Sequence, residues 1–252
     1  MITFDRDETT LEEEERVALT GSRRAGKSYV AEHGGYEAYG VADPMYRLSE
    51  HYLGTSDKSE DGVRAFLQSI GALGRGEDPD GECPVGRVSW DSIKEDIRKY
   101  GSEITPYDTN LWARFGRQPS FWVKMLSARV GRADGRIAVP NARFPNEIST
   151  LMEEHGFAHY HVMCHPTTRR VRLSQSGEDP DGDAEEDVTE RLAQELNEIA
   201  RTGDVKSALD GSMMCSDLGP RLLRKVAKRE TVIWSDPHLT PDFDRTASQV
   251  YT

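Results

Sequence analysis

One stretch of the sequence combines residues that are typical of phosphate binding. Gly21 is followed by four residues and then by Gly26, Lys27 and Ser28, the full pattern of a phosphate-binding loop. In such a loop the backbone N–H groups face the anion, the lysine reaches the β- and γ-phosphates, and the serine hydroxyl ligates Mg²⁺. The pattern therefore predicts that a nucleoside triphosphate binds to loop residues Gly21, Ser22, Arg23, Arg24, Ala25, Gly26, Lys27 and Ser28.

The residues around this loop suit the elements that would position it. An apolar run over residues 17–19 precedes the loop and is typical of a strand in a buried parallel sheet. Residues 28–32 can begin a helix, which Gly34 and Gly35 would end. The alternative is a chance glycine-rich turn in front of a helix, and the strand before the loop counts against it.

The rest of the chain alternates between short apolar runs and helical patterns. Further strands are expected over residues 36–42, 136–140 and 157–164, and helices over residues 45–52, 60–73, 89–100, 119–130, 145–155 and 188–201. This alternation predicts an α/β fold, with a parallel sheet and helices on both of its faces. We expect one domain over residues 1–252, with an acidic leader over residues 1–15, an ambiguous edge strand over residues 231–234 and a tail over residues 237–252.

The composition limits the partners and the location of the protein. The chain has 252 residues, a formal charge of -12 and 36% hydrophobic residues, which suits one α/β domain with a sizeable core. An acidic chain does not favour a broad nucleic-acid surface, so small nucleotides are the expected partners. The three cysteines are far apart, and neither a signal segment nor a membrane-spanning run occurs. We therefore expect a cytoplasmic protein without membrane contacts, and a homodimer is left open.

Two places early in the chain carry side chains that could bind an acceptor. Asp43 follows the second expected strand, at the edge where open α/β sheets bind ligands. Its carboxylate could ligate Mg²⁺ or lie beside an acceptor phosphate, and a plain helix cap beside Pro44 is the alternative. Arg64 and Gln68 are four residues apart on an expected helix and point from one face. Arginine suits phosphate and glutamine suits a base edge, whereas alone the pair would indicate a solvated face.

Arg143 and Glu147 follow the third expected strand, again at the ligand-binding edge of the sheet. The position favours a role for Arg143 in binding phosphate. Glu147 could hold that arginine in place or contact a sugar hydroxyl. The alternative is a structural ion pair between these two side chains.

Three arginines, Arg169, Arg170 and Arg172, lie in an expected irregular segment after the fourth strand. Phosphoryl transfer needs positive charge at the transferring group, and a mobile lid would deliver it while excluding water. An acidic run over residues 178–190 follows, and we expect it to be a mobile loop. These acids could instead neutralise the arginines in a structural salt-bridge loop.

Five blocks of sequence occur in a fixed order across most of the chain. They are residues 21–28, Val-Ala-Asp-Pro-Met at 41–45, Arg-Ala-Phe-Leu-Gln-Ser-Ile-Gly at 64–71, Arg-Gln-Pro-Ser-Phe-Trp-Val at 117–123 and Ala-Arg-Phe-Pro-Asn-Glu at 142–147. Together they resemble the deoxynucleoside monophosphate kinases of tailed phages, and Val-Thr-Glu at 188–190 resembles a motif that follows the lid in that family. The loop pattern is common to many families, whereas the ordered combination is more specific.

The resemblance implies a three-layer P-loop NTPase fold, with a helical acceptor-binding insertion over residues 44–130 and an arginine-rich lid over residues 165–187. It also implies ATP- and Mg²⁺-dependent phosphorylation of deoxynucleoside monophosphates to diphosphates. The catalytic residues would be Lys27, Arg169 and Arg170, and the Mg²⁺ ligands would be Ser28 and Asp43. The acceptor would be surrounded by Asp43, Arg64, Gln68, Trp122, Arg143 and Glu147.

Two features depart from the family pattern. Asn141 stands where the family usually has aspartate, which removes a candidate carboxylate near Mg²⁺, and residues 72–110 form an insertion that could change the acceptor. One alternative function is therefore a kinase of the same fold that acts on a hydroxymethylated base in DNA, although the acidic insertion does not suit a polymer. Another is a nucleotide-binding regulatory protein with little turnover. The preferred base is not indicated by the sequence.

Overall fold

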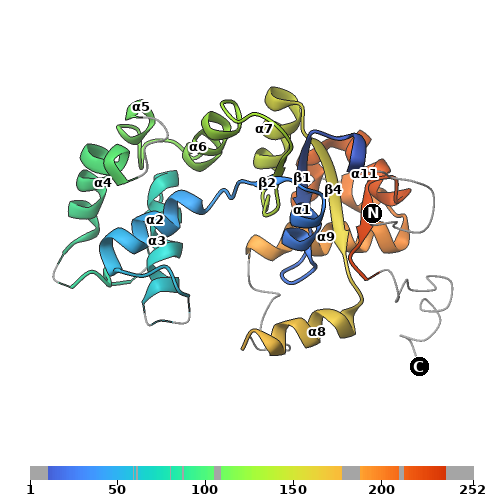
Figure 1. The fold of residues 1–252 in the computed structure, drawn as a ribbon, viewed down its shortest axis with the longest axis horizontal. Helices are drawn as coiled ribbons and strands as arrows, with labels where there is room; N and C mark the ends of the chain where they lie inside the picture. The colour runs from blue at the N-terminus through green and yellow to red at the C-terminus, as the bar shows by residue number, and fades with distance from the viewer. Residues whose placement is uncertain are drawn as a thin grey trace. The chain divides into compact units, whose positions relative to one another are not determined.

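The structure, a computed structural model, describes residues 11–58, 60, 62–79, 81–86, 88–104, 109–177, 188–209 and 213–236. The expected tail, most of the expected leader and residues 178–187 of the expected lid lie outside the described residues. The chain divides into two compact units, one of Met1–Ala38 with Asp134–Thr252 and one of Tyr39–Ala133. We call them the sheet unit and the helical unit (Figure 1). The helical unit contains the whole of the expected insertion over residues 44–130.

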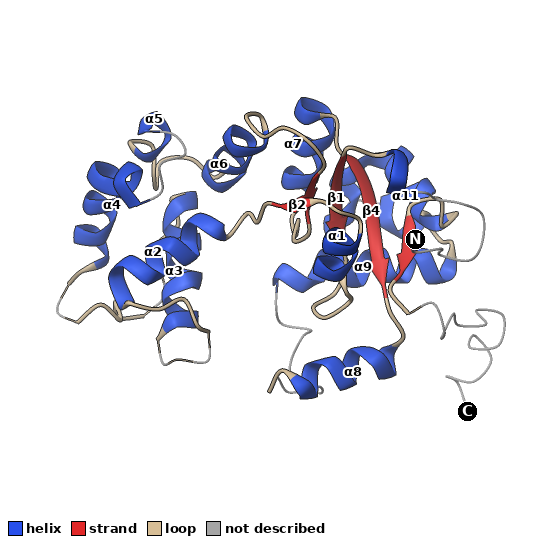
Figure 2. Cartoon of the chain, viewed as in Figure 1, coloured by secondary structure: helices blue, strands red, loops and turns tan. Residues whose placement is uncertain are grey.

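The sheet unit is built on five parallel strands in the described part of the chain, in the order β2-β3-β1-β4-β5 (Figure 2). The strands are β1 (Arg16–Thr20), β2 (Glu37–Ala38), β3 (Ile137–Val139), β4 (Ala158–Met163) and β5 (Val232–Trp234). Val17 of the central strand pairs with Ala138 on one side and with Ala158 on the other. The predicted parallel sheet is confirmed, and the ambiguous residues 231–234 supply the edge strand β5 next to β4.

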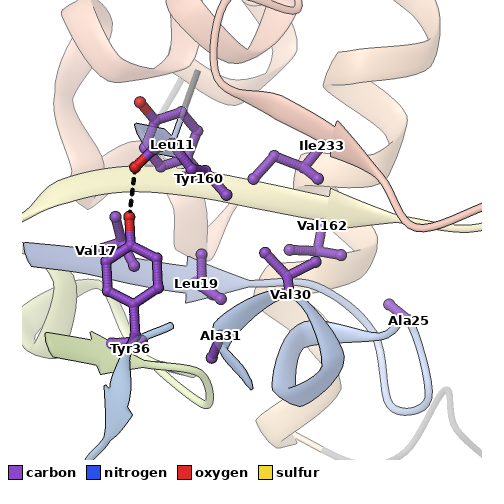
Figure 3. Close-up of a cluster of buried hydrophobic side chains, with 11 residues drawn as sticks. Leu11, Val17, Leu19, Ala25, Val30, Ala31, Tyr36, Tyr160, Val162 and Ile233 are labelled. Carbon is purple, nitrogen blue, oxygen red and sulfur yellow. Dashed lines mark hydrogen bonds between the residues drawn. The ribbon is translucent and has the colours of Figure 1, made fainter. Parts of the chain in front are cut away.

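The two faces of the sheet are covered by different helices. Side chains alternate along a strand, so Val17 and Leu19 of β1 share one face, where they join a cluster that contains Val30 of α1 (Lys27–His33) (Figure 3). Thr20 points to the opposite face, towards His161 of β4 and α9 (Val188–Thr202). This arrangement is compatible with a three-layer α/β fold.

The remaining elements in the described part of the sheet unit are helical. They are the 3₁₀ helices η1 (Leu11–Glu13) and η2 (Met214–Leu218) and the α-helices α7 (Pro145–His155), α8 (Pro166–Gln175), α10 (Lys206–Leu209) and α11 (Gly219–Ala227). Helix α11 packs against α9, and η2 packs against α7, α9 and α11. Pro145 begins α7 and Gly156 ends it in the left-handed conformation, so this helix has the predicted bounds.

The helical unit has its own aromatic core. Its helices are α2 (Asp43–Leu53), α3 (Val63–Arg75), α4 (Trp90–Ile104), α5 (Thr109–Trp112) and α6 (Phe121–Val130). The rings of Phe121 and Trp122 meet edge to face, with their centroids 4.9 Å apart. The Trp122 indole N–H donates to the Gly71 carbonyl over 2.9 Å, and a Cβ on Gly74 would lie 2.4 Å from the same ring. Glycine at position 74 therefore lets α3 and α6 approach closely.

The structure differs from the sequence-based expectations in four places. The second strand is short, because the chain turns at Gly40 and begins α2 at Asp43. The segment with Arg169 and Arg170 is helical rather than irregular, since Pro166 starts α8 and the His165 side chain accepts from the Thr167 N–H. At the end of the expected leader, Leu11 is buried and accepts a hydrogen bond from the Tyr36 hydroxyl (Figure 3). At the end of the expected mobile acidic loop, Glu190 is buried in α9.

Candidate phosphate-binding site

The glycine loop, residues 21–28, leaves the carboxyl end of the central strand β1 and runs into α1. From β1 the chain continues to β2 at one edge of the sheet, and from β4 it continues to β5 at the opposite edge. The carboxyl ends of β1 and β4 therefore flank the point where the connections diverge, which is where open α/β sheets bind ligands. The loop lies between a strand and a helix, as the sequence predicted.

The two glycines of the loop pattern have backbone positions that other residues would fill poorly. Gly21 has a φ of 141°, and a Cβ there would lie 2.3 Å from the Val162 carbonyl oxygen. Gly26 has a φ of 97°, and a Cβ there would lie 2.8 Å from Ser235. Both glycines allow the loop to turn sharply against the ends of β4 and β5. The first-turn N–H groups of α1 have no carbonyl partner within the helix, as at any helix N-terminus.

The ammonium group of Lys27 is enclosed by the loop. Its Nζ donates to the carbonyl oxygens of Gly21 and Ser22, over 2.6 and 2.8 Å. Burial lowers the pKa of Lys27 to about 8, and the positive charges of Arg143 and Arg169 lower it further, whereas the Glu190 carboxylate opposes this shift. Three cationic side chains thus influence one another beside the loop, which creates a field that favours an anion.

Helix α8 holds two arginines against the loop. Arg169 Nε donates to the Arg23 carbonyl oxygen over 3.1 Å, and Arg172 donates to the Arg24 carbonyl over 3.2 Å. Arg172 also forms an ion pair with Asp236 over 3.0 Å, and the Asp236 carboxylate accepts from the His165 N–H. The structure therefore brings the predicted Arg169 to the loop. Arg170, which was predicted as its catalytic partner, is the next residue of α8 and is exposed, and it therefore points in a different direction around the helix axis.

Helix α9 contacts the loop at two points that are two turns apart. The Glu190 carboxylate accepts from the Arg23 backbone N–H over 2.7 Å, and Glu190 is only 5% exposed. Asn197 donates through Nδ2 to the Ser22 hydroxyl over 3.0 Å. The sequence resemblance included Glu190 but gave it no role, and Asn197 had no sequence signal beyond its place on an amphipathic helix.

A chain of buried hydrogen bonds continues from Asn197 under the loop. Asn197 Oδ1 is an acceptor, so the neutral His161 donates to it through Nε2 over 2.9 Å and accepts through Nδ1. The Thr20 hydroxyl therefore donates to His161 Nδ1 and accepts from His159 Nε2, each over 2.9 Å. Burial lowers the pKa of His161 to about 4 and that of His159 to about 3, with further lowering by Lys27 and His161 respectively. Both imidazoles are thus neutral at pH 7.

Glu147 caps the N-terminus of helix α7, which follows strand β3 in the chain. Its carboxylate accepts from the backbone N–H groups of Arg143 and Phe144, over 2.7 and 3.2 Å, and the residue is 5% exposed. Glu147 therefore fixes the backbone that carries Arg143, whereas its contact with a sugar hydroxyl stays a prediction. The Arg143 side chain is exposed and close enough to Lys27 to lower its pKa.

Four of the predicted acceptor residues belong to the helical unit. Asp43 Oδ2 accepts from Arg129 over 2.9 Å and from the Gly40 N–H over 2.8 Å, so its carboxylate has a structural partner in that unit. Arg64 and Gln68 are exposed on one face of α3, as predicted from their spacing. Trp122 is 3% exposed, which favours a packing role, and its contact with an acceptor stays a prediction.

The predicted metal ligands are Ser28, which is exposed in the first turn of α1, and Asp43. Among the described residues, no group of three or more His, Cys, Asp or Glu side chains could hold a metal ion. A Mg²⁺ ion held mainly by phosphate oxygens does not need such a group.

Within the described residues, no helix is long and apolar enough to cross a membrane.

Comparison with known proteins found no match among family models, curated sequences or solved structures.

Proposed function

We propose that this protein is an ATP- and Mg²⁺-dependent kinase that phosphorylates deoxynucleoside monophosphates to diphosphates. The observation that carries the proposal is the glycine loop with an enclosed Lys27 ammonium, at the point where the strand connections diverge. In the complex, oxygens of the triphosphate would replace the Gly21 and Ser22 carbonyls as hydrogen-bond acceptors of Lys27. The lysine would then stabilise charge on the transferring phosphoryl group.

The residues around the loop suit a polyanionic donor. Arg169 and Arg143 add positive charge beside Lys27, and Arg169 could turn towards phosphate oxygens of the donor. The exposed Ser28 hydroxyl would be a ligand of Mg²⁺. Bound Mg²⁺ would neutralise phosphate charge, and Arg169 would orient the γ-phosphoryl group.

Recognition of the acceptor is the less constrained part of the proposal. Arg143 belongs to the sheet unit, and its backbone is fixed by Glu147. Arg64 and Gln68 offer a guanidinium and an amide on an exposed helix face, which suit a phosphate and a base edge. Among the described residues Arg64 has no recorded hydrogen bond or ion pair, so it is available to a ligand. Asp43 would act only if a ligand competes with Arg129 for its carboxylate.

The proposed function is tested by ADP release from ATP, measured with and without each of the four common deoxynucleoside monophosphates. We expect release that depends on one or more acceptors, and loss of several orders of magnitude of turnover in Lys27→Ala. Arg143→Ala should raise the acceptor KM with little change in ATP affinity. Near-normal turnover in a folded Lys27→Ala variant would contradict the role of the loop.

The rival function is a nucleotide-binding regulatory protein with little turnover. Asn141 in place of a carboxylate favours it, and so does the Glu190 carboxylate that already bonds to the loop. ATP binding without acceptor-dependent ADP release would support this rival. Transfer to hydroxymethylated DNA in the same assay would instead support the kinase that acts on a polymer.

A further inference from the structure

The Glu190 carboxylate bonds to a backbone group of the kind that a phosphate-binding loop offers to its ligand. Its Oε2 lies 2.7 Å from the Arg23 nitrogen, which is short for an N–H···O bond and typical of a charged acceptor. Glu190 is 5% exposed, so water does not compete strongly for this bond. An anion from within the chain therefore occupies part of the loop.

The charges around the loop explain why a buried carboxylate is tolerated there. Glu190 raises the pKa of Lys27 against the effect of burial, so the two charges attract each other. The same ammonium is influenced by Arg143 and Arg169. These cationic side chains would stabilise a phosphate group as well as they stabilise the carboxylate. A phosphate group and the Glu190 carboxylate side by side would repel each other in this poorly solvated site.

The remainder of α9 is anchored independently of Glu190. Leu192, Leu196 and Ile199 are buried, and Asn197 holds the helix to Ser22 and His161. Glu190 lies in the first turn of α9, and the hydrogen bonds of Asn197 do not involve its side chain. The carboxylate can thus leave the Arg23 N–H while the helix stays in place.

We propose that Glu190 is an internal competitor for the phosphate site and that a polyphosphate binds by displacing its carboxylate from the Arg23 N–H. This inference rests on the proposed role of the glycine loop in binding a triphosphate. Displacement exchanges one singly charged acceptor for a more highly charged one, so the loop discriminates against weakly charged anions. Glu190 is then a specificity-determining residue for the donor.

The test compares wild-type protein with Glu190→Gln by calorimetric titration with ATP and, separately, with tripolyphosphate. Glutamine keeps the shape and an acceptor oxygen but removes the competing charge. We expect both ligands to bind about tenfold more tightly to the variant. In the variant the ligand does not have to break a charge-assisted hydrogen bond, and one such bond corresponds to roughly one decade of affinity. Unchanged or weaker binding of both ligands by a folded variant would overturn the proposal.

Glu195→Gln is the matched control on the same helix. Its carboxylate also accepts backbone N–H bonds, from Met214 and Cys215 over 3.1 and 2.8 Å, but these lie in η2 and not in the loop. We expect this control to lose stability and to keep wild-type affinity for ATP. A tenfold gain in the control as well would show that the effect of Glu190→Gln is indirect.

Two further measurements separate the possible failures. Lys27→Ala that binds ATP as wild type does would refute the phosphate loop itself, whereas loss in Lys27→Ala with no gain in Glu190→Gln would refute the displacement alone. If Glu190→Gln does not fold, the wild type still provides a measurement through the ¹³C resonance of the Glu190 carboxylate. We expect that resonance to shift to the value of a solvated glutamate on saturation with tripolyphosphate, and an unchanged resonance would overturn the proposal.

Discussion

At the scale of single residues, the polar and charged groups of the glycine loop have partners within the protein. Lys27 uses the carbonyls of Gly21 and Ser22 as partners, and Glu190 uses the Arg23 N–H. Each of these groups is satisfied by the loop itself or by α9. The proposed binding of an anion would therefore exchange existing hydrogen-bond partners, so its net free energy would be smaller than the new contacts alone suggest.

The lowered pKa of Lys27 predicts that ATP binding takes up a proton in alkaline solution. Burial lowers this pKa from 10.5 to about 8, so the empty protein loses the ammonium charge above that pH. A bound polyanion favours the charged form and raises the pKa again. At pH 9 we expect uptake of up to about one proton per ATP, and almost none at pH 7.

Titration calorimetry in two buffers of different ionisation enthalpy measures this uptake. Lys27→Arg is the control, because arginine stays charged at pH 9. The prediction is wrong if the wild type binds ATP at pH 9 with the same apparent enthalpy in both buffers.

The buried histidines predict that the sheet unit loses stability in mild acid. Burial lowers the pKa of His161 from 6.5 to about 4 and that of His159 to about 3. Below pH 6.5 the unfolded chain binds protons that the folded protein excludes, so stability falls until the folded pKa values are reached. The slope is about 1.4 kcal/mol per pH unit for each histidine.

Urea unfolding between pH 7 and pH 4.5 measures that slope. We expect His159→Gln to remove one histidine's share of it. His33→Gln, which replaces an exposed histidine, serves as the control for the loss of a histidine. Equal slopes in the wild type and His159→Gln would contradict the assignment of a neutral buried imidazole.

At the scale of elements, the sequence predicted best where a local signal and the tertiary packing agree. Helix α7 has the expected bounds because Pro145 and Gly156 mark its ends. Helix α8 was missed, since its arginine-rich sequence carries little apolar periodicity and the helix is stabilised by the His165 cap and by Arg172. Glu190 belonged both to the predicted helix over residues 188–201 and to the expected mobile acidic run, and its burial was not predicted, because charge composition alone does not show that a distant N–H and Lys27 surround one of those acids.

The cap of α7 gives a prediction about this element. Glu147→Ala leaves the N–H groups of Arg143 and Phe144 without their acceptor, so we expect a loss of about 1–2 kcal/mol in the free energy of unfolding. Glu153→Ala, at an exposed position of the same helix, should change it by less than about 0.5 kcal/mol. Urea denaturation measures both, and equal losses would show that Glu147 is not the cap.

At the scale of the whole molecule, the chain has two compact units with separate cores. The helical unit contains Trp90, Trp112 and Trp122, whereas the sheet unit contains Trp234. The sequence predicted the helical insertion but treated the chain as one domain. Composition could not show that the aromatic residues of the insertion pack on one another, because their contacts join α3, α5 and α6 across some fifty residues.

This division predicts that the two units respond differently to core substitutions. In a Trp234→Phe background, tryptophan fluorescence reports only the helical unit. Phe121→Ala removes a fully buried ring that contacts Trp112, at a cost of about 3–5 kcal/mol, and should lower the midpoint of that fluorescence transition strongly. Leu19→Ala, in the core of the sheet unit, should lower it much less. Equal shifts would mean that both units unfold as one cooperative body.

The helical unit also connects two strands of the sheet. Strands β2 and β3 are parallel neighbours, so some crossover must join them, and here the crossover is the entire helical unit. A crossover can lengthen, shorten or be replaced in evolution without altering the strand order. The glycine loop, Arg143, Arg169 and Glu190 all lie outside it. Lineages that share the proposed donor site could therefore inherit it unchanged while Arg64, Gln68 and the rest of the proposed acceptor surface are replaced together.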